Sequence, residues 1–434
     1  MQPAPAEGPA GDPPLLRAMG TWGLTASIIN ITIAGSILVL PGTLGASMGP
    51  SASLAFLLGA VLFVPLMLCF ASVGSRVVAS GGPYVYVETA FGRFPAFLMA
   101  ALLWISSVSG SGSIAAALAD QLTQFSPLFS QPLARAALLL GVYGSLIAVN
   151  AAGVRAGAHA NMLFAAAKVL PLLLIAVLGL LHVQWQHFEV HAWPGAQALG
   201  TALLLVVFAY SGAETALAPS GEMRDNARVV PTAVSLGVGA VVLLYVVIQI
   251  VCQGMLGDAL AGHPAPVSAV AGQVMRGGAV LVMATAGISL YGCLQGDLLG
   301  TSRLLFALAR DGLLPSPLSR VTSRTRVPLV ALITHAAAAC CVAIAGSFGA
   351  LALLSGGAFC FVYMGCAAAA WQLQRQGYSQ TAAPVTLPGG PLIPFIGIAG
   401  FAAILASLQA REWLAIGAAL LLISALYAIA RRRR

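Results

Sequence analysis

The sequence predicts an all-α integral membrane protein with twelve transmembrane helices, built as a five-plus-five inverted repeat with discontinuous helices 1 and 6. The chain of 434 residues is 59% hydrophobic and only 7% charged, whereas soluble domains carry about 25% charged residues. Apolar stretches of about 20 residues, enough to cross a bilayer, recur along the whole chain. Two of them, five spans apart, are interrupted by residues that disfavour a helix.

The expected spans follow one another with short connections, which leaves little room for a water-soluble domain. We expect a disordered cytoplasmic tail over 1–19 that lacks the basic and apolar regions of a signal peptide. The first half of the repeat is expected over 20–182, the second over 197–373, and two peripheral spans over 390–430. The twelve spans are expected at 21–47, 51–73, 94–119, 133–151, 160–182, 197–219, 231–255, 278–309, 327–346, 350–373, 392–409 and 412–430.

The net charge of +8 does not indicate nucleic-acid binding, because the basic residues lie in short loops and not in a stripe between aromatic residues. Fifteen arginines fall in the tail, in the loops on the same side and at the C-terminus, against three in the opposite loops. This bias predicts that both termini are cytoplasmic, in a cytoplasmic (inner) membrane. We interpret the terminal RRRR as a topology anchor near anionic headgroups and not as a specific lipid site.

The first interrupted span contains NITIAGSILVLPG (30–42), with Gly35 and Ser36 at mid-span and Pro41 after them. The sixth span repeats the pattern with Gly212, Glu214 and then Pro219. An unwound helix inside a membrane is tolerated where it faces protein or a cavity, and paired interruptions are a sequence pointer to the midplane site of an inverted-repeat transporter. The alternative is that Gly35 and Gly212 only allow close helix packing.

Several motifs carry a family resemblance that covers residues 20–430. FAYSGAETALAPSGEMRDNARVVP (208–231) is similar to the sixth-span signature of the amino acid–polyamine–organocation transporters, and SGGPYVYVETAFG (80–92) to the segment after their second span. NAAGVRAGAHANMLFAAAKVLPLL (150–173) and GTSRLLFALARDGLLP (300–315) agree with their fourth to fifth and eighth spans. The first-span motif departs from the family's Gly-Ser-Gly-Ile, because Ser36 carries a side chain that could narrow the carboxylate pocket or add a hydroxyl donor.

The resemblance implies a substrate site between spans 1, 3, 6 and 8. The amides of an unwound helix and the positive end of a half-helix suit a substrate carboxylate, and exposed carbonyls suit an ammonium. The expected contacts are backbone donors for the carboxylate at Gly35, Ser36 and Ile37, and contacts to the amino end and side chain from Phe208, Ser211 and Gly212.

Three ionisable residues inside expected spans are functional candidates by default. Burial favours the neutral acid for Glu214, which could carry a proton, join a gating network or simply bind freed amides. Lys168 lies deep in span 5, and the resemblance implies that its ammonium can replace a sodium ion between spans 1 and 8; the alternative is a lysine that snorkels to an interface. Asp297 could attract a cationic substrate, carry a proton or pair with Arg303. Because positions six apart do not share a helix face, we favour a cavity-facing Asp297.

The expected function is secondary active transport of an amino acid or related amine by alternating access, coupled to protons. The alternatives are an exchanger or exporter of the same substrates, or a non-transporting nutrient sensor. His187 and His191 have metal-ligand spacing, but Pro194 follows closely and argues against a helix there, so we expect no metal site. We also expect no cofactor and no enzyme activity. The expected partners are a small-molecule substrate, the proton and the lipid bilayer; the oligomeric state stays open.

Overall fold

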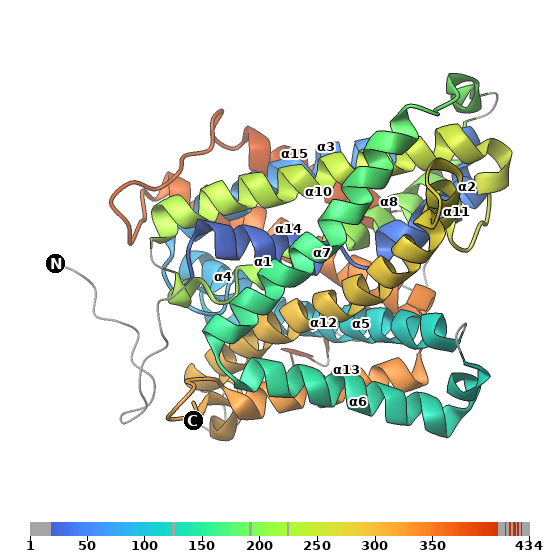
Figure 1. Ribbon diagram of the computed structural model, residues 1–434. Coiled ribbons are helices and arrows are strands. Elements are labelled where there is room, and N and C mark those ends of the chain that lie inside the picture. The colour runs from blue at the N-terminus through green and yellow to red at the C-terminus, as the bar shows by residue number, and fades with distance from the viewer. Residues whose placement is uncertain are drawn as a thin grey trace.

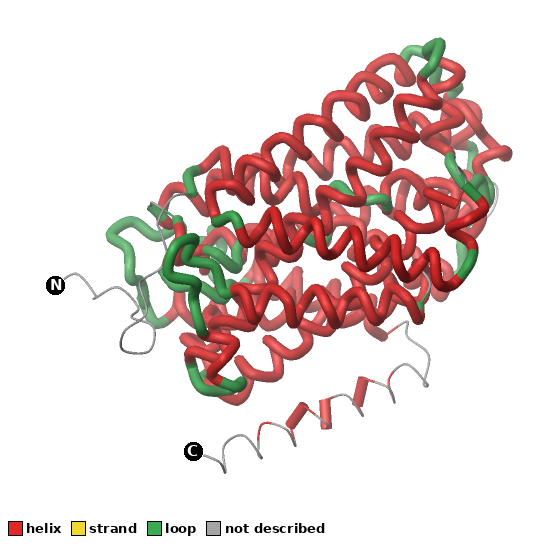
Figure 2. The backbone as a smooth tube through the Cα atoms, turned by 60° about the horizontal axis from the view of Figure 1, so that its bottom comes forward, coloured by secondary structure: helices red, strands yellow, loops and turns green. Residues whose placement is uncertain are grey.

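The computed structural model describes residues 19–406 apart from 124–125, 191–192, 224 and 347, together with scattered positions between 413 and 427. The described chain is helical, and its helices run between two ends of the molecule where the loops gather (Figures 1 and 2). Apart from an isolated bridge between Met19 and Met223, no strand pairing occurs in the described part. The all-helical fold class is therefore confirmed.

The helices of the N-terminal part alternate between long apolar segments and short connecting pieces. They are α1 (Thr21–Thr32), α2 (Ser36–Met48), α3 (Ala52–Arg76), α4 (Pro83–Phe91), α5 (Arg93–Thr123), α6 (Pro132–Ala151) and α7 (Val154–Leu180). Those of the C-terminal part are α8 (Ala196–Tyr210), α9 (Ala213–Ala216), α10 (Asn226–Leu256), α11 (Pro266–Val274), α12 (Gly278–Arg310), α13 (Leu329–Ala345), α14 (Phe348–Arg375) and α15 (Leu392–Ala406).

Within the described residues, eight helical stretches are long and apolar enough to cross a membrane, and α13 and α15 are shorter apolar helices. Eleven of the expected spans overlap helices of the structure. The twelfth, 412–430, lies mostly outside the described residues, so the total of twelve spans and the inverted repeat stay predictions. The expected tail also lies outside them, except for Met19, whose amide donates to the carbonyl of Glu222 over 3.1 Å.

Local sequence explains where several helices start. Asp225 precedes α10, and its side chain accepts a hydrogen bond from the amide of Ala227 over 3.1 Å, as an N-cap residue does. α4 begins with Pro83 in its first turn, after Gly82 at φ +54°. Proline is well placed there because its missing N–H would be unpaired in any helix, and glycine adopts the positive φ without steric cost.

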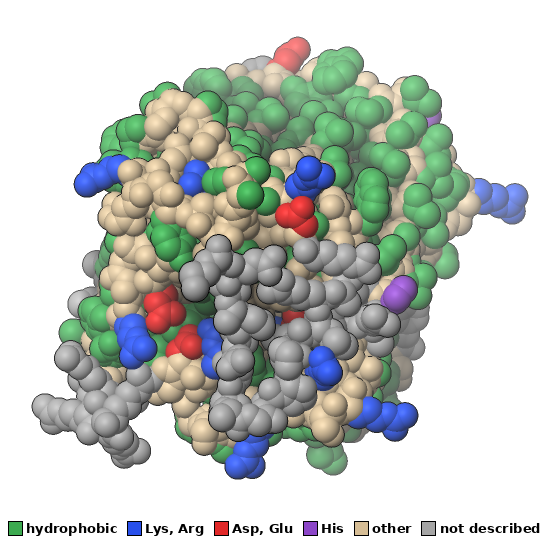
Figure 3. Space-filling view, turned by 90° about the vertical axis from the view of Figure 1, so that its left-hand side faces the viewer, with side chains coloured by type: hydrophobic (Ala, Val, Ile, Leu, Met, Phe, Trp, Pro, Cys, Tyr) green, Lys and Arg blue, Asp and Glu red, His purple; other side chains and the backbone are tan. Residues whose placement is uncertain are grey.

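One end of the molecule, here called the basic end, carries the ends of α3 and α12, the start of α5 and the segment after α14. Its exposed arginines include Arg93, Arg320 and Arg375, and Figure 3, which faces this side, shows basic side chains around its rim. Hydrogen bonds tie the connections together: the amide of Gly81 donates to the carbonyl of Ala218 over 2.8 Å. Loops that are distant in sequence therefore meet at one end, as the arginine distribution predicts.

The two predicted interruptions are present. Span 1 is broken at 33–35, between α1 and α2, and span 6 at 211–212, between α8 and α9. The first break lies slightly earlier than the glycine and proline pattern suggests, because Ser36 is the first residue of α2 and the helix continues through Pro41. Pro41 is the sixth residue of α2, past the first turn, so the helix continues there without the hydrogen bond that the amide of another residue would make.

Candidate functional site

The break in span 1 leaves two helix ends facing each other across three residues. α1 closes with a hydrogen bond from the amide of Ile33 to the carbonyl of Ile29 over 2.9 Å. α2 then begins at Ser36 with no side-chain cap. The first amides of a helix have no intrahelical partner and carry a partial positive charge. The amides of Ser36 and Ile37 belong to this first turn, which makes α2 a suitable end for an anionic group.

The break in span 6 depends on one glycine. Gly212 has φ +132°, a conformation that other residues rarely adopt. A Cβ added to Gly212 would lie 2.8 Å from Oγ1 of Thr32 and 2.9 Å from its amide nitrogen. Two interruptions about 180 residues apart therefore touch. They can approach this closely because Gly212 has no side chain.

A cavity of about 40 Å³ lies where the two breaks meet. Of the expected contact residues, Ser36, Phe208, Ser211 and Gly212 line it, together with hydroxyl-bearing residues of α5. Gly35 lines a neighbouring cavity, and Ile37 is wholly buried and lines neither. Besides the expected spans 1, 3, 6 and 8, α14 contributes Phe359 to the lining.

The neighbouring cavity, of about 250 Å³, lies toward the end opposite the basic end. α2 contributes Gly35 and Leu38 to it, α5 contributes Asp120, and the segment before and within α11 covers it. Because Gly35 stands between Ala34 and Ser36, which line the smaller cavity, the two cavities adjoin at the break of span 1. A solute could therefore approach the breaks from this side.

Toward the basic end the site is closed by packed side chains. Glu222 and Arg303 form a salt bridge there, with both side chains fully buried. Nearby, the hydroxyl of Tyr84 donates to Oδ2 of Asp311 over 2.9 Å, and the hydroxyl of Ser220 to the carbonyl of Ala79 over 2.6 Å. The cavity is thus approached from one end and sealed at the other.

Lys168 points from α7 into the break of span 1. Its ammonium donates to the carbonyl oxygens of Asn30 at 2.8 Å, Ile33 at 2.7 Å and Ser289 at 3.0 Å. The residue is completely buried, so it does not extend to an interface. An ammonium has three donors, and all three are used on carbonyls of spans 1 and 8.

Glu214 lies beside the cavity and not among the residues that line it. Its Oε1 accepts from the amide of Gly212 over 2.8 Å, and its Oε2 accepts from the hydroxyl of Tyr363 over 2.9 Å. The carboxyl therefore satisfies an amide freed by the break and links α9 to α14. Of the three expected roles, the support of freed amides and membership of a gating network are compatible with these contacts, and that of proton carrier stays a prediction.

Asp297 lines the cavity, as we favoured from its helix position. Its Oδ2 lies 2.8 Å from Nε2 of His335, and its Oδ1 accepts from the hydroxyl of Thr301 over 3.1 Å. The alternative pairing with Arg303 is wrong, because Arg303 donates from Nε to Oε1 of Glu222. On a regular helix the two side chains point to different sides, and α12 is not distorted between them.

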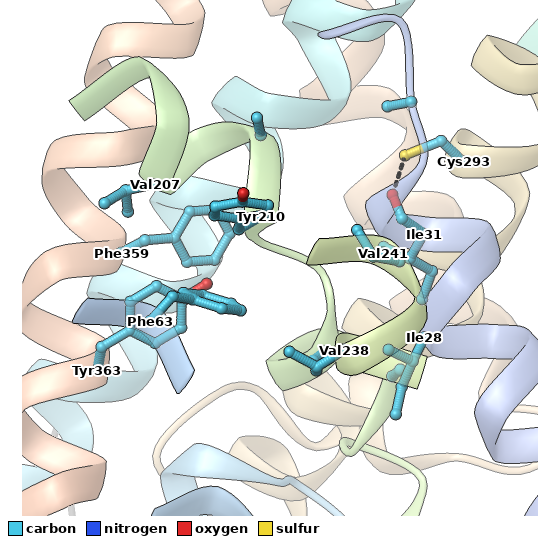
Figure 4. Close-up of a cluster of buried hydrophobic side chains, with 14 of the residues drawn as sticks. Ile28, Ile31, Phe63, Val207, Tyr210, Val238, Val241, Cys293, Phe359 and Tyr363 are labelled. Atoms are coloured by element: carbon cyan, nitrogen blue, oxygen red, sulfur yellow. Dashed lines mark hydrogen bonds between the residues drawn. The ribbon is translucent and has the colours of Figure 1, made fainter. Parts of the chain in front are cut away.

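Two glycines of α12 allow this helix to pack closely against spans 1 and 6 beside their interruptions. A Cβ at Gly296 would lie 2.3 Å from Cγ1 of Ile31, and one at Gly300 would lie 2.4 Å from the carbonyl oxygen of Thr215. One turn before Asp297, the thiol of Cys293 donates to the carbonyl of Ile31 over 2.8 Å, as drawn in Figure 4. The same view shows aromatic side chains gathered beside the break of span 6.

Sequence reasoning missed His335, Tyr363, Phe359 and Cys293. His335 carried a usable signal, because an ionisable residue inside an apolar helix is a functional candidate. The other three carried none, since buried tyrosine, phenylalanine and cysteine are ordinary core residues. The structure does not test the possible metal pair, because His191 lies outside the described residues. Nδ1 of His187 lies 2.8 Å from the carbonyl of Gly254, and no group of three or more potential metal ligands occurs among the described residues.

A model of the amino acid permease family matches residues 19–428. The chain belongs to this family. The match confirms the resemblance to the amino acid–polyamine–organocation transporters that the motifs indicate. This permease is therefore a multi-pass membrane protein, and its relatives are transporters.

Individual relatives are distant. The permease is 28% identical over 327 residues to the chloroplastic cationic amino acid transporter 9 of Arabidopsis thaliana, covering 71% of this chain and 58% of that one. It is 25% identical over 421 residues to the serine/threonine exchanger SteT of Bacillus subtilis, covering 94% of each chain. The permease spans between 54% and 59% of the length of three plant cationic amino acid transporters that it matches.

Among solved structures, a Na⁺-coupled sialic acid symporter in a substrate-bound outward-open state is similar in fold. The TM-score is 0.58 with 11% sequence identity, over 90% of this chain and 89% of that one. At this identity the likeness concerns the fold alone. The permease therefore shares an overall fold with that symporter.

Proposed function

We propose that this permease is a secondary active transporter that moves an amino acid or a related amine across the cytoplasmic membrane by alternating access. The observation that carries the proposal is the contact between the two interrupted spans at a cavity. In inverted-repeat transporters the substrate site lies at such broken helices. The amides at the start of α2 would receive the substrate carboxylate, and Phe208, Ser211 and Gly212 would contact the rest of the molecule.

We propose that transport is coupled to protons, with Lys168 in place of a sodium ion. Three carbonyl oxygens of spans 1 and 8 already bind its ammonium, so a sodium ion would have to displace it. Loss of the proton from Lys168 would leave an amine with two donors for three carbonyls, which would loosen the link between α7, span 1 and α12. Glu214 is the second coupling or gating candidate, because it joins the break of span 6 to α14.

The orientation proposed for the membrane puts the basic end in the cytoplasm. The excess of arginines at that end supports it by the positive-inside rule. The larger cavity, covered by the segment before and within α11, then lies on the outer side, and the sealed end, with Glu222 and Arg303, faces the cytoplasm. Both termini would be cytoplasmic.

Flux measurements on the purified protein in liposomes test the function. A thermal-shift screen of amino acids and amines identifies a ligand, and counterflow of that ligand then reports transport. We expect uptake that follows an inward proton gradient and ignores a sodium gradient. Uptake that follows sodium and ignores the proton gradient would contradict proton coupling. Binding without any flux would favour the nutrient sensor, and strict dependence on internal substrate would favour an exchanger.

A variant of Lys168 tests the coupling site itself. Lys168→Met keeps an unbranched side chain that is one atom shorter and removes the ammonium, so three buried carbonyls lose their partner. We expect proton-driven uptake to fall at least tenfold. Leu170→Met on the same helix is the matched control, because Leu170 is 65% exposed on the outer surface. Uptake by Lys168→Met equal to that of the control would contradict a role for Lys168.

A further inference from the structure

We propose that Asp297, held by His335 and Thr301, binds the side-chain ammonium of the substrate, so that the site prefers a cationic amino acid or amine to an uncharged isostere. This inference rests on the proposed transport function and adds a substrate class to it. It assigns a substrate-binding role to Asp297 and a positioning role to His335.

The first step is the place of Asp297 between the two breaks. On its own helix, Gly296 lies against Ile31 of span 1, and Gly300 lies against Thr215 of span 6. These close contacts leave Asp297 facing the cavity, where it is one of the lining residues. A group bound at its carboxylate would therefore lie between the two interrupted helices.

The second step is the charge of the pair. Nε2 of His335 lies 2.8 Å from Asp297, while Nδ1 is buried and has no hydrogen-bond partner among the described residues. A neutral ring with its proton on Nε2 leaves only an acceptor nitrogen unpaired. A protonated ring would leave a buried N–H donor without an acceptor, and this costs more. The geometry therefore favours a neutral His335 and an ionised Asp297.

The third step is the absence of a counter-charge. The described residues that line the cavity include no lysine or arginine, and Arg303 is occupied by Glu222. A buried charge is costly unless it is paired. Each carboxylate oxygen has room for a second donor, so Asp297 can accept from an ammonium while it keeps its bonds to His335 and Thr301.

The fourth step concerns the other acceptors for an ammonium. The carbonyls at the end of α1 already accept hydrogen bonds: Ile31 from the thiol of Cys293, Thr32 from the hydroxyl of Tyr245, and Asn30 and Ile33 from Lys168. By contrast, the hydroxyls of Thr32 and Ser107 are buried without a partner and belong to the lining of the cavity. The cavity thus offers one charged acceptor and two unused hydroxyls to a ligand.

The cavity also limits the size of the ligand. A space of about 40 Å³ has room for only a few water molecules, because one water needs roughly 10–15 Å³ measured in this way. A short side chain fits this space better than a long one. The combination points to a short cationic amino acid, of which ornithine is a suitable probe, or to a short amine.

Binding of two isosteric amino acids tests the inference. Ornithine and norleucine have side chains of the same length, with an ammonium in the first and a methyl group in the second. We expect the purified wild-type protein to bind ornithine at least tenfold more tightly than norleucine in a thermal-shift titration at neutral pH. Equal affinities, or tighter binding of norleucine, would overturn the proposal.

Four variants then test which residues the preference for ornithine depends on. Asp297→Asn removes the charge, and we expect it to abolish the preference for ornithine while norleucine binds as well as before or better. Asp258→Asn removes an exposed carboxylate outside the two cavities and should leave the ratio unchanged. His335→Gln keeps a neutral donor toward Asp297, and we expect the preference to survive, whereas His335→Ala should weaken it.

The outcomes separate this inference from the proposed function. An unchanged ratio in Asp297→Asn, or a changed ratio in Asp258→Asn, would overturn the role of Asp297. A neutral amino acid that is transported with no preference for ornithine would overturn the substrate class and leave the transporter intact. If Asp297→Asn does not fold, the wild-type ratio for the two probes still decides the proposal.

Discussion

Arg303 donates from Nε to Oε1 of Glu222 over 2.9 Å, and both side chains are completely buried. The pair joins α12 to the segment after α9, on the side of the cavity that faces the basic end. Arg303 also donates from Nη1 to the carbonyl of Leu299 over 2.8 Å. A buried ion pair stabilises little against an apolar replacement, but the loss of one partner leaves an uncompensated charge.

We therefore predict that Glu222→Gln destabilises the protein by about 3–5 kcal/mol and lowers its melting temperature in detergent. The double substitution Glu222→Leu with Arg303→Met should cost less than the sum of the single changes, because no charge is left unpaired. Asp120→Asn is the control, since Asp120 pairs with Arg135 while its side chain is 60% exposed, and exposed pairs contribute at most about 1 kcal/mol. Additive losses in the double variant would argue against a coupled pair.

Gly212 should not tolerate a side chain. Gly212→Ala would place a Cβ 2.8 Å from Thr32 Oγ1 and would force φ +132° on alanine. We expect a loss of monodisperse protein in size-exclusion chromatography, or at least a tenfold loss of uptake. Gly239→Ala is the matched control, because Gly239 lies within α10 and a Cβ there meets nothing within 4 Å. A Gly212→Ala protein that folds and transports like Gly239→Ala would contradict the close contact of the breaks.

Glu214 and Tyr363 should act as one unit. Tyr363→Phe removes the hydroxyl that donates to Glu214 over 2.9 Å, and we expect a cost of about 1 kcal/mol in stability. Glu214→Gln turns one acceptor into a donor and should cost more, because the carboxyl also accepts from the amide of Gly212. In uptake assays the double variant should be no worse than Glu214→Gln alone. An additive loss would show that the two residues act independently.

Glu88 lies in α4, outside the membrane-spanning segments. Its titration should make the stability of the folded protein depend on pH. Burial first, and repulsion from Asp311 second, raise the pKa of Glu88 above its ordinary value. The folded state therefore favours the protonated carboxyl, and stability is lost as the pH rises from the ordinary pKa, about 4.3, through the higher pKa of the folded state. The variant Glu88→Gln cannot ionise, so it should be more stable than the wild type at alkaline pH.

Melting temperatures of Glu88→Gln and the wild type across this pH range check the effect. The difference between the two proteins should be small at acid pH, where the carboxyl is protonated in both states, and should grow as the pH rises. Asp258→Asn, at an exposed site, should show no such growth. A constant difference for Glu88→Gln, or a variant that becomes less stable at high pH, would contradict the prediction.

The sequence predicts the parts of the site that depend on backbone preference. The break of span 6 follows from Gly212, because a glycine is the residue that takes φ +132° without cost. The break of span 1 was placed a little late, since the pattern counted Pro41 as a helix breaker and α2 continues through it. Proline disfavours the interior of a helix, but tertiary context can override such a local preference.

The sequence could not predict which side chains meet. Asp297 was expected to face the cavity, but its bond to His335 joins α12 to α13 across 38 residues. Nothing in the spacing of Asp297 and His335 along the sequence indicates that the two residues pair. The side chain of Ile37 is buried and lines neither cavity, because the rotation of α2 about its axis depends on its neighbours; the expected role of its backbone amide as a donor stays a prediction.

By itself, the sequence determined that this chain lies in a membrane, that it is helical and that two of its helices are interrupted. These properties follow from composition and from the local preferences of glycine, and both act within a few residues along the chain. Only the tertiary structure decided that Lys168 reaches three carbonyls and that His335 supports Asp297. Such contacts depend on how whole helices rotate and pack against one another, and that packing is settled by the fold as a whole.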